Sequence, residues 1–152
     1  MLANQGLSRM AATQVLHEEG EMRNTIEMLF GSGLSNAAGL AWLKVGSSSA
    51  VGGYDTYVDP AAIRRDGDSV KMWHMHDFKI AQAAADKTYW SSKNMVEYDC
   101  ANVRRRTLYF SWNAERMGAG EVIHRMDEPS EWRPVVPGSI AEILCRFACR
   151  KR

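Results

Sequence analysis

The first forty residues carry a helical pattern of apolar positions. Apolar side chains recur on one stripe, at Val15, Met22, Ile26, Leu29 and Phe30. This spacing predicts a helix over residues 8–30, with Ser8 as N-cap and Gly31 as its stop. The small residues that follow predict a linker. We therefore expect a helical extension with its linker at residues 1–39 and a domain at residues 40–152.

After residue 40 the pattern changes to short strands separated by turns. Six strands are expected, at residues 41–45, 54–59, 69–79, 92–101, 106–113 and 121–126. The Gly/Ser-rich residues 46–53 predict a loop, and the polar, Ala-rich residues 80–90 predict a connection. Short strands joined by turn signals, with few long crossovers, are typical of an antiparallel meander. Together with a helix at each end, the pattern predicts an α+β fold built on a six-stranded antiparallel sheet.

The fourth strand shows which way one cysteine faces. Apolar Val96 and Tyr98 alternate with charged Glu97 and Asp99, so one face of this strand is buried and the other is wet. Cys100 continues the apolar series and is expected to face the core.

A C-terminal helix is marked by a capping box, in which Ser139 caps the first turn and Glu142 reaches back. Apolar residues follow at helical spacing, at Ile140, Ile143, Leu144 and Phe147. Neither Cys145 nor Cys149 lies on this stripe. Three cysteines allow one bridge and one spare thiol, so the periodicity leaves both helix cysteines open as partners of Cys100.

Composition excludes several classes of protein. A chain of 152 residues with a formal charge of +1 has no bulk attraction to nucleic acid or anionic lipid. The longest apolar runs are far below a transmembrane length. The N-terminus lacks a basic start followed by an uninterrupted apolar stretch, so no signal peptide is expected in this chain. Taken literally, that places the protein in the cytoplasm, unless the start is misassigned or a natural leader was replaced.

A partner-binding surface is one reading of the fifth strand. Arg104, Arg105 and Arg106 form a basic run at its start, which could bind a polyanion or could be a solvated edge. Farther along, Leu108, Phe110 and Trp112 alternate with Tyr109 and Ser111. Tyr109 therefore lies on the face away from the apolar one, where an aromatic side chain could join a partner-binding surface.

Metal binding and catalysis find little support in the residues. His74 and His76 share one face of a strand beside Asp77, but only His124, of unknown position, offers a further ligand. The serines lack a nucleophile-elbow sequence, and no glycine-rich loop could cradle a phosphate. We expect no metal, no cofactor and no enzymatic activity.

An ordered series of short motifs resembles a known family. The series comprises Trp42-Leu43-Lys44-Val45, Tyr57-Val58-Asp59-Pro60, Ile63-Arg64-Arg65, Val70-Lys71-Met72-Trp73 ending in Asp77, Ser91-Ser92-Lys93, Glu97-Tyr98-Asp99-Cys100, Met117-Gly118, Trp132-Arg133-Pro134-Val135, Pro137-Gly138-Ser139 and Cys149. In order and spacing it resembles the surface-adhesin protein E-like domain of Gram-negative bacteria, over roughly residues 40–149.

The resemblance implies a six-stranded antiparallel sheet whose concave face carries the C-terminal helix, tethered by a disulfide. It favours Cys149 over Cys145 as the partner of Cys100. It also implies an exported protein, at the cell surface or in the periplasm, that binds host extracellular-matrix proteins. The alternative is a periplasmic module that binds a small apolar ligand or a cell-wall component between helix and sheet. The apolar stripe of the N-terminal helix needs cover, so a homodimer contact is a further expectation.

Overall fold

The computed structural model describes residues 41–150. The helix predicted at residues 8–30 and its linker lie outside the described residues. Within them, an antiparallel sheet is followed by one C-terminal helix, α3, at Ile140–Cys149. The strands are β1 (Leu43–Ser48), β2 (Tyr54–Val58), β3 (Arg64–Asp66), β4 (Ser69–Ala84), β5 (Lys87–Asp99), β6 (Arg104–Asn113), β7 (Val122–Met126) and β8 (Arg133–Pro134).

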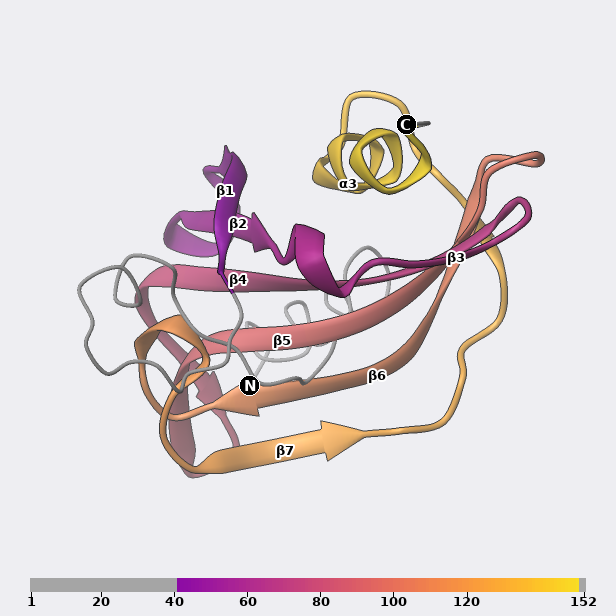
Figure 1. The fold of residues 1–152 in the computed structure, drawn as a ribbon. Helices are drawn as coiled ribbons and strands as arrows, with labels where there is room; N and C mark the ends of the chain where they lie inside the picture. Colours follow the sequence, from indigo (N-terminus) through magenta and orange to yellow (C-terminus); the bar gives the residue numbers. More distant parts are fainter. Residues whose placement is uncertain (1–40, 151–152) are drawn as a thin grey trace.

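Six of these strands form the sheet that the sequence predicts. Their order is β1-β2-β4-β5-β6-β7, and every pairing is antiparallel. Two short strands extend the sheet: β3 pairs with β4, and β8 pairs with β6. The long strands β4, β5 and β6 bend toward helix α3, so the helix lies on the concave side of the sheet (Figure 1).

The prediction that residues 80–90 form a connection is wrong. Strand β4 continues to Ala84, and β5 begins at Lys87 after a two-residue turn in which Ala85 has a φ of 59°. The register shifts between Asp77 and Gln82, which lets the hairpin bend and continue pairing. Tyr89 in this hairpin is fully buried and stacks on Trp112, with ring centroids 4.6 Å apart. Cross-strand pairing and this stack outweigh the polar local composition.

Strand β1 also extends into a predicted loop, as far as Ser48. Gly46 in this extension lies directly beneath helix α3. A Cβ added at Gly46 would meet the Cδ1 atoms of Ile143 and Ile140 at 3.3 and 3.4 Å. The glycine therefore allows the helix to approach the sheet closely.

Helix α3 is rotated relative to the predicted apolar stripe. Its buried residues are Ile140, Ala141, Leu144, Cys145 and Ala148, whereas Ile143 is 40% exposed. Of the predicted stripe, Ile140 and Leu144 are buried and Phe147 packs against the core, so the prediction is wrong only at Ile143. The small residues Ala141 and Ala148 complete the buried side of the helix. This rotation carries Cys145 into the core.

The capping box forms with one change. Ser139 Oγ accepts a hydrogen bond from Glu142 N at 3.2 Å, as the sequence predicts. The Glu142 carboxylate accepts from Gly138 N at 2.8 Å, one residue before the N-cap. Side chains thus accept hydrogen bonds from two backbone N–H groups at the start of the helix.

A disulfide joins the sheet to the helix. Cys100, just beyond β5, is bonded to Cys149 at the last turn of α3, 49 residues later. The bridge confirms the pairing that the family resemblance favoured. A second contact supports it, because Arg65 Nη2 donates hydrogen bonds to the carbonyl oxygens of Ala148 (2.8 Å) and Arg150 (3.0 Å).

Two histidines of β4 lie in the core. His74 and His76 are almost fully buried, with ring centroids 4.9 Å apart, and His76 Nδ1 lies 2.9 Å from Thr56 Oγ1. Burial lowers the pKa of His76 to about 3, with a further contribution from the positive charge of Arg105. Burial also lowers the pKa of His74, together with the charges of His76 and Arg105. Both imidazoles are therefore neutral in the folded protein at neutral pH.

Replacing Cys100 and Cys149 together by alanine should lower the free energy of unfolding by about 4 kcal/mol. The loop-entropy model assigns that value to a closed loop of about fifty residues. Urea denaturation of the oxidised wild type and of the variant measures the difference, and reduced wild type should match the variant. A variant as stable as oxidised wild type would show that the tether does not stabilise the fold.

The buried histidines should make stability fall in mild acid. Their folded pKa values lie below the unfolded value of about 6.5, so the unfolded chain takes up protons first as the pH falls. Each histidine then lowers the free energy of unfolding by up to about 1.4 kcal/mol per pH unit, as the pH falls from about 6.5 toward the pKa of the folded state. Chemical denaturation across that window should show a smaller slope for His76→Gln than for wild type. His124→Gln, which removes an exposed imidazole, is the matched control; an unchanged slope in His76→Gln would contradict the assignment.

Candidate partner-binding surface

The predicted arginine cluster is divided between the two faces of the sheet. All three arginines begin strand β6, and side chains alternate along a strand. Arg105 lies opposite Tyr98, points into the core and is only 4% exposed. Arg104 and Arg106 point to the outer face, the side of the sheet away from helix α3. Only these two arginines share a surface, and Arg105 is removed from it.

A tryptophan far along the chain holds these two arginines. The guanidinium carbon of Arg104 lies 4.8 Å from the ring centroid of Trp132, and that of Arg106 lies 4.7 Å from it. Trp132 reaches this place because the next residues form β8, which pairs with the start of β6. The motif containing Trp132 was part of the family resemblance, but no sequence spacing pointed to this contact.

Neighbouring carboxylates neutralise both arginines. Arg104 Nε donates to Asp99 Oδ2 at 2.8 Å, and Arg106 Nε donates to Glu97 Oε1 at 2.8 Å. Hydrogen bonds from Asn102 and then Arg104 hold the pKa of Asp99 well below its usual range. Burial alone would raise the pKa of Glu97, but hydrogen bonds from Ser69 and Arg106 outweigh it and lower that pKa. With two cations facing two anions, this surface does not favour a polyanion.

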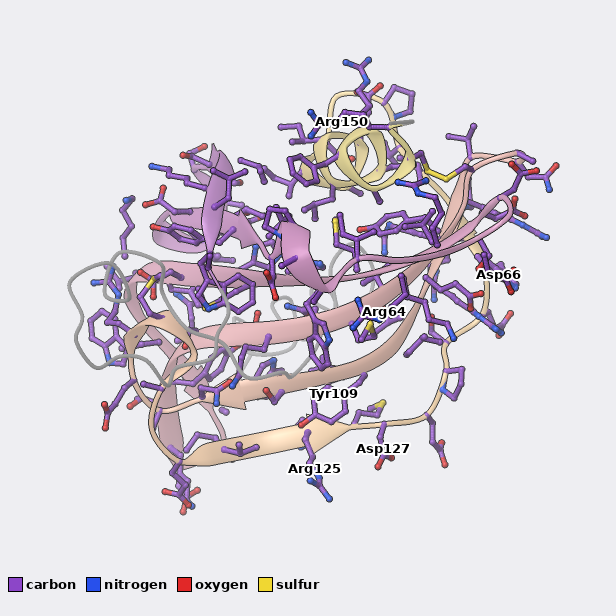
Figure 2. The ribbon with its side chains drawn as sticks, in the orientation of Figure 1. Arg64, Asp66, Tyr109, Arg125, Asp127 and Arg150 are labelled. Atoms are coloured by element: carbon purple, nitrogen blue, oxygen red, sulfur yellow. A yellow bond between two sulfur atoms is a disulfide. The ribbon has the colours of Figure 1, made fainter. Side chains whose placement is uncertain are left out.

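Tyr109 continues the same face as the sequence predicts. It lies in a cross-strand row with Met95 of β5 and Trp73 of β4. The rings of Tyr109 and Trp73 meet edge to face, with centroids 6.0 Å apart, and all three side chains are half-buried. Figure 2 shows Tyr109 on the side of the sheet opposite helix α3, near Arg125 of β7.

Leu108 does not take its predicted place beside Phe110 and Trp112. The β5–β6 register shifts between Met95 and Val96, which pair with Tyr109 and Thr107, so Leu108 is the extra residue of a bulge. The bulge changes the alternation, so that Arg105 and Thr107 face inward before it and Phe110 faces inward after it. Arg106 and Tyr109 consequently both reach the outer face. We name the resulting set the outer aromatic surface; it comprises Trp73, Met95, Arg104, Arg106, Tyr109 and Trp132.

An ion pair between the exposed Arg116 and the buried carboxylate of Asp77 lies at the other end of this face. Asp77 is 3% exposed and accepts hydrogen bonds from Arg116 Nη2 at 2.6 Å and from Met117 N at 2.7 Å. These bonds hold the short 3₁₀ turn Arg116–Gly118 against the sheet. A Cβ at Gly118 would meet Lys93 at 2.9 Å and Met75 Sδ at 3.3 Å, so glycine lets the turn lie flat on the face.

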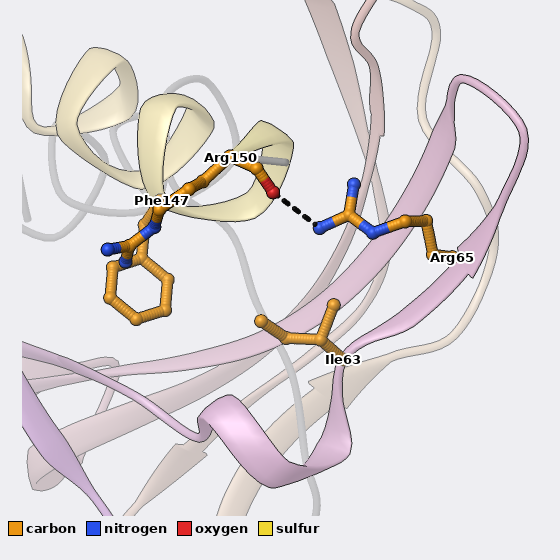
Figure 3. Close-up of a pocket in the computed structure, with 4 residues that line it drawn as sticks. All are labelled: Ile63, Arg65, Phe147 and Arg150. Atoms are coloured by element: carbon orange, nitrogen blue, oxygen red, sulfur yellow. Dashed lines mark hydrogen bonds between the residues drawn. The ribbon is translucent and has the colours of Figure 1, made fainter. Parts of the chain in front are cut away.

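A pocket of about 290 Å³ opens between the end of helix α3 and β3 (Figure 3). Apolar Ile63 and Phe147 and basic Arg65 and Arg150 line it. Arg65 is held by its bonds to the helix carbonyls, and Arg150 lies over the Phe147 ring, 4.3 Å from its centroid. Farther along the helix, Leu144 and the other inward side chains are buried against the sheet. Space for a ligand between helix and sheet is thus found at the helix end.

The contact between Thr56 and His76 lies in the core. Thr56 Oγ1 and His76 Nδ1 are within hydrogen-bonding distance, and both residues are buried. Among the described residues, no group of three His, Cys, Asp or Glu side chains is placed to hold a metal ion. His124 packs its ring against Phe110 and Trp112, away from the buried histidine pair. Within residues 41–150, no helix is long and apolar enough to span a membrane.

A solved structure of Haemophilus influenzae protein E shares this fold. Its second crystal form is similar with a TM-score of 0.52 and 14% sequence identity, covering 62% of this chain and 79% of that chain. Another structure of the same protein is 15% identical and covers 73% of this chain and 98% of that chain, with a TM-score of 0.49. Likeness at such low identity shows the fold alone. No curated protein sequence matches the chain.

A family model provides the sequence evidence. The model described as surface-adhesin protein E matches residues 42–150, which includes every described strand and helix α3. Because the match spans well over half of the chain, this protein belongs to the surface-adhesin protein E family.

Proposed function

We propose that this protein is a bacterial surface adhesin that binds a host matrix protein through the outer aromatic surface. The observation that carries the proposal is the stack of Arg104 and Arg106 on Trp132, next to the Trp73–Tyr109 pair. Tryptophan, tyrosine and arginine are the residues most enriched where protein interfaces gain their affinity. Family membership supports the adhesin role.

The arrangement of charges favours a protein partner over a polyanion. The edges of both guanidinium groups bind carboxylates, while their faces lie on the Trp132 ring. These side chains are already held in place, so a partner that packs on them loses little further rotamer entropy. A partner surface that presents aromatic, aliphatic and hydrogen-bonding groups fits this chemistry, and bulk positive charge plays little part.

An extracytoplasmic location fits the same proposal. Disulfides persist in oxidising compartments such as the periplasm and the cell surface, and cytoplasmic thiol systems keep most cysteines reduced. The Cys100–Cys149 bridge therefore supports export to the periplasm or the cell surface. It outweighs the cytoplasmic expectation that the N-terminal residues alone suggested.

The pocket at the helix end supports a second candidate function, the binding of a small ligand. Its two apolar and two basic lining residues favour an anionic molecule with a compact apolar part, such as a carboxylate. This chemistry differs from the purely apolar ligand that the sequence suggested, because Arg65 and Arg150 line the pocket.

Trp132→Ala should weaken binding of the full chain to its matrix protein at least tenfold, because it removes the support of both arginines. Surface plasmon resonance against immobilised collagen, fibronectin and laminin measures this, with circular dichroism to confirm the fold. Arg146→Gln, on the opposite side of the molecule in helix α3, should bind as wild type does. Absence of wild-type binding to every matrix protein would refute the adhesin proposal. Equal binding by folded Trp132→Ala would exclude this surface as the site.

For the pocket, an anionic aromatic dye, 8-anilinonaphthalene-1-sulfonate, is a suitable probe. Phe147→Ala removes an apolar wall and should reduce the bound-dye fluorescence several-fold. Lys87→Gln, on the distant β4–β5 hairpin, is the matched control and should bind as wild type does. Equal fluorescence from wild type and Phe147→Ala would exclude the pocket as a ligand site and leave the adhesin proposal untouched.

A further inference from the structure

Three cysteine sulfurs meet at the C-terminal end of helix α3. Cys149 is bonded to Cys100, and the unbonded Cys145 Sγ lies 3.9 Å from Cys149 Sγ. Cys145 is 6% exposed and faces the core, one helical turn before Cys149. A thiol is thus held against a disulfide by the helix that the disulfide tethers.

We propose that Cys145 is the attacking thiol of an internal thiol–disulfide exchange that moves the bridge from Cys100–Cys149 to Cys145–Cys149. The Cys145 thiolate bonds to Cys149 Sγ as the Cys100–Cys149 bond breaks, and the electron pair leaves on Cys100 Sγ, which takes up a proton. One disulfide and one thiol are present before and after. The step therefore needs no oxidant and no reductant.

Helix geometry controls when the exchange occurs. Residues four apart on a helix have Cβ atoms about 5–6 Å apart, whereas a disulfide needs about 3.5–4.5 Å. The last turn of α3 must therefore loosen slightly before Cys145 can bond to Cys149. Cys149 is the final helical residue, and Arg150 after it is already extended, so the required change falls where helices fray most readily.

The core also keeps the attacking thiol inactive in the closed state. Burial raises the pKa of the Cys145 thiol; the charge of Arg105 from β6 lowers it in part, and Glu142 on the same helix raises it. Only the thiolate attacks a disulfide, so the closed fold suppresses the reaction. Opening of the last turn admits water and would bring the thiol toward its ordinary acidity.

The exchange would release the helix from the sheet. The new bridge lies within α3, and Cys100, at the turn between β5 and β6, becomes a free thiol. The hydrogen bonds from Arg65 to Ala148 and Arg150 and the packing of α3 would then hold the helix end alone. The three cysteines therefore form a latch that can open without a change in the redox state of the protein.

Peptide mapping tests the latch directly. The oxidised full chain is incubated without added thiol, at neutral pH and near the ordinary thiol pKa of about 8.5, with and without sub-denaturing urea. The chain is then unfolded in mildly acidic guanidinium chloride with excess N-ethylmaleimide, which stops the exchange and labels the free thiol wherever it lies; trypsin afterwards cleaves at Arg146 between the two helix cysteines. We expect the label on Cys145 at neutral pH. At the higher pH with urea, we expect at least half of it on Cys100, together with a Cys145–Cys149 disulfide peptide.

Two results would overturn the proposal. In one, the label stays on Cys145 under all conditions, although added dithiothreitol opens the bridge in the same buffer. In the other, the label moves to Cys149, which means that Cys145 attacked Cys100 instead. Cys145→Ser is the matched control: it has no attacking thiol, so it should retain the Cys100–Cys149 bridge and remain unlabelled. Loss of that bridge in the control would also count against exchange by Cys145.

Discussion

The covalent link between Cys100 and Cys149 is the constraint on which the arrangement of the described domain depends. It holds the last turn of helix α3 against the end of β5. With that end held, the helix crosses β1 at Gly46, where the absence of a side chain allows close approach. At Gly46 the helix contacts come from Ile140 and Ile143, while Ala141, Leu144, Cys145 and Ala148 are buried. The tether and Gly46 are thus two points at which the helix lies close to the sheet.

The alternation of side chains that buries one face of the sheet also determines which residues lie on the other face. Alternation along β6 sends Arg105 inward and leaves Arg104 and Arg106 outside, where Trp132 and two carboxylates hold them. A bulge at Leu108 then keeps Tyr109 on the outer side. The inner face is committed to the helix and to the buried histidine pair. The outer face is consequently the side that can offer aromatic and arginine side chains to a partner.

The stabilising contacts and the proposed adhesive contacts therefore lie on opposite sides of one sheet. Covalent and apolar contacts concentrate beneath helix α3, where the disulfide, the spare thiol and the core meet. The proposed adhesive contacts lie on the opposite side, on residues held by stacking and ion pairs. A change in the tether would first alter the helix and the pocket at its end. The outer aromatic surface, supported by the central strands, would be affected less directly.

The sequence by itself determined the sheet, the capped helix and the inward direction of Cys100, because two-residue and 3.6-residue periods are local properties of the chain. The antiparallel arrangement followed from the short connections between strands, and the tether partner followed from the family resemblance. Residues 80–90 were misread because their strand character comes from pairing across a hairpin and from the Tyr89–Trp112 stack. The rotation of helix α3, the division of the arginine cluster and the place of Trp132 were likewise decided only in three dimensions. Each depends on contacts between residues that are distant in the chain. A local pattern does not indicate which distant residue will pack against it.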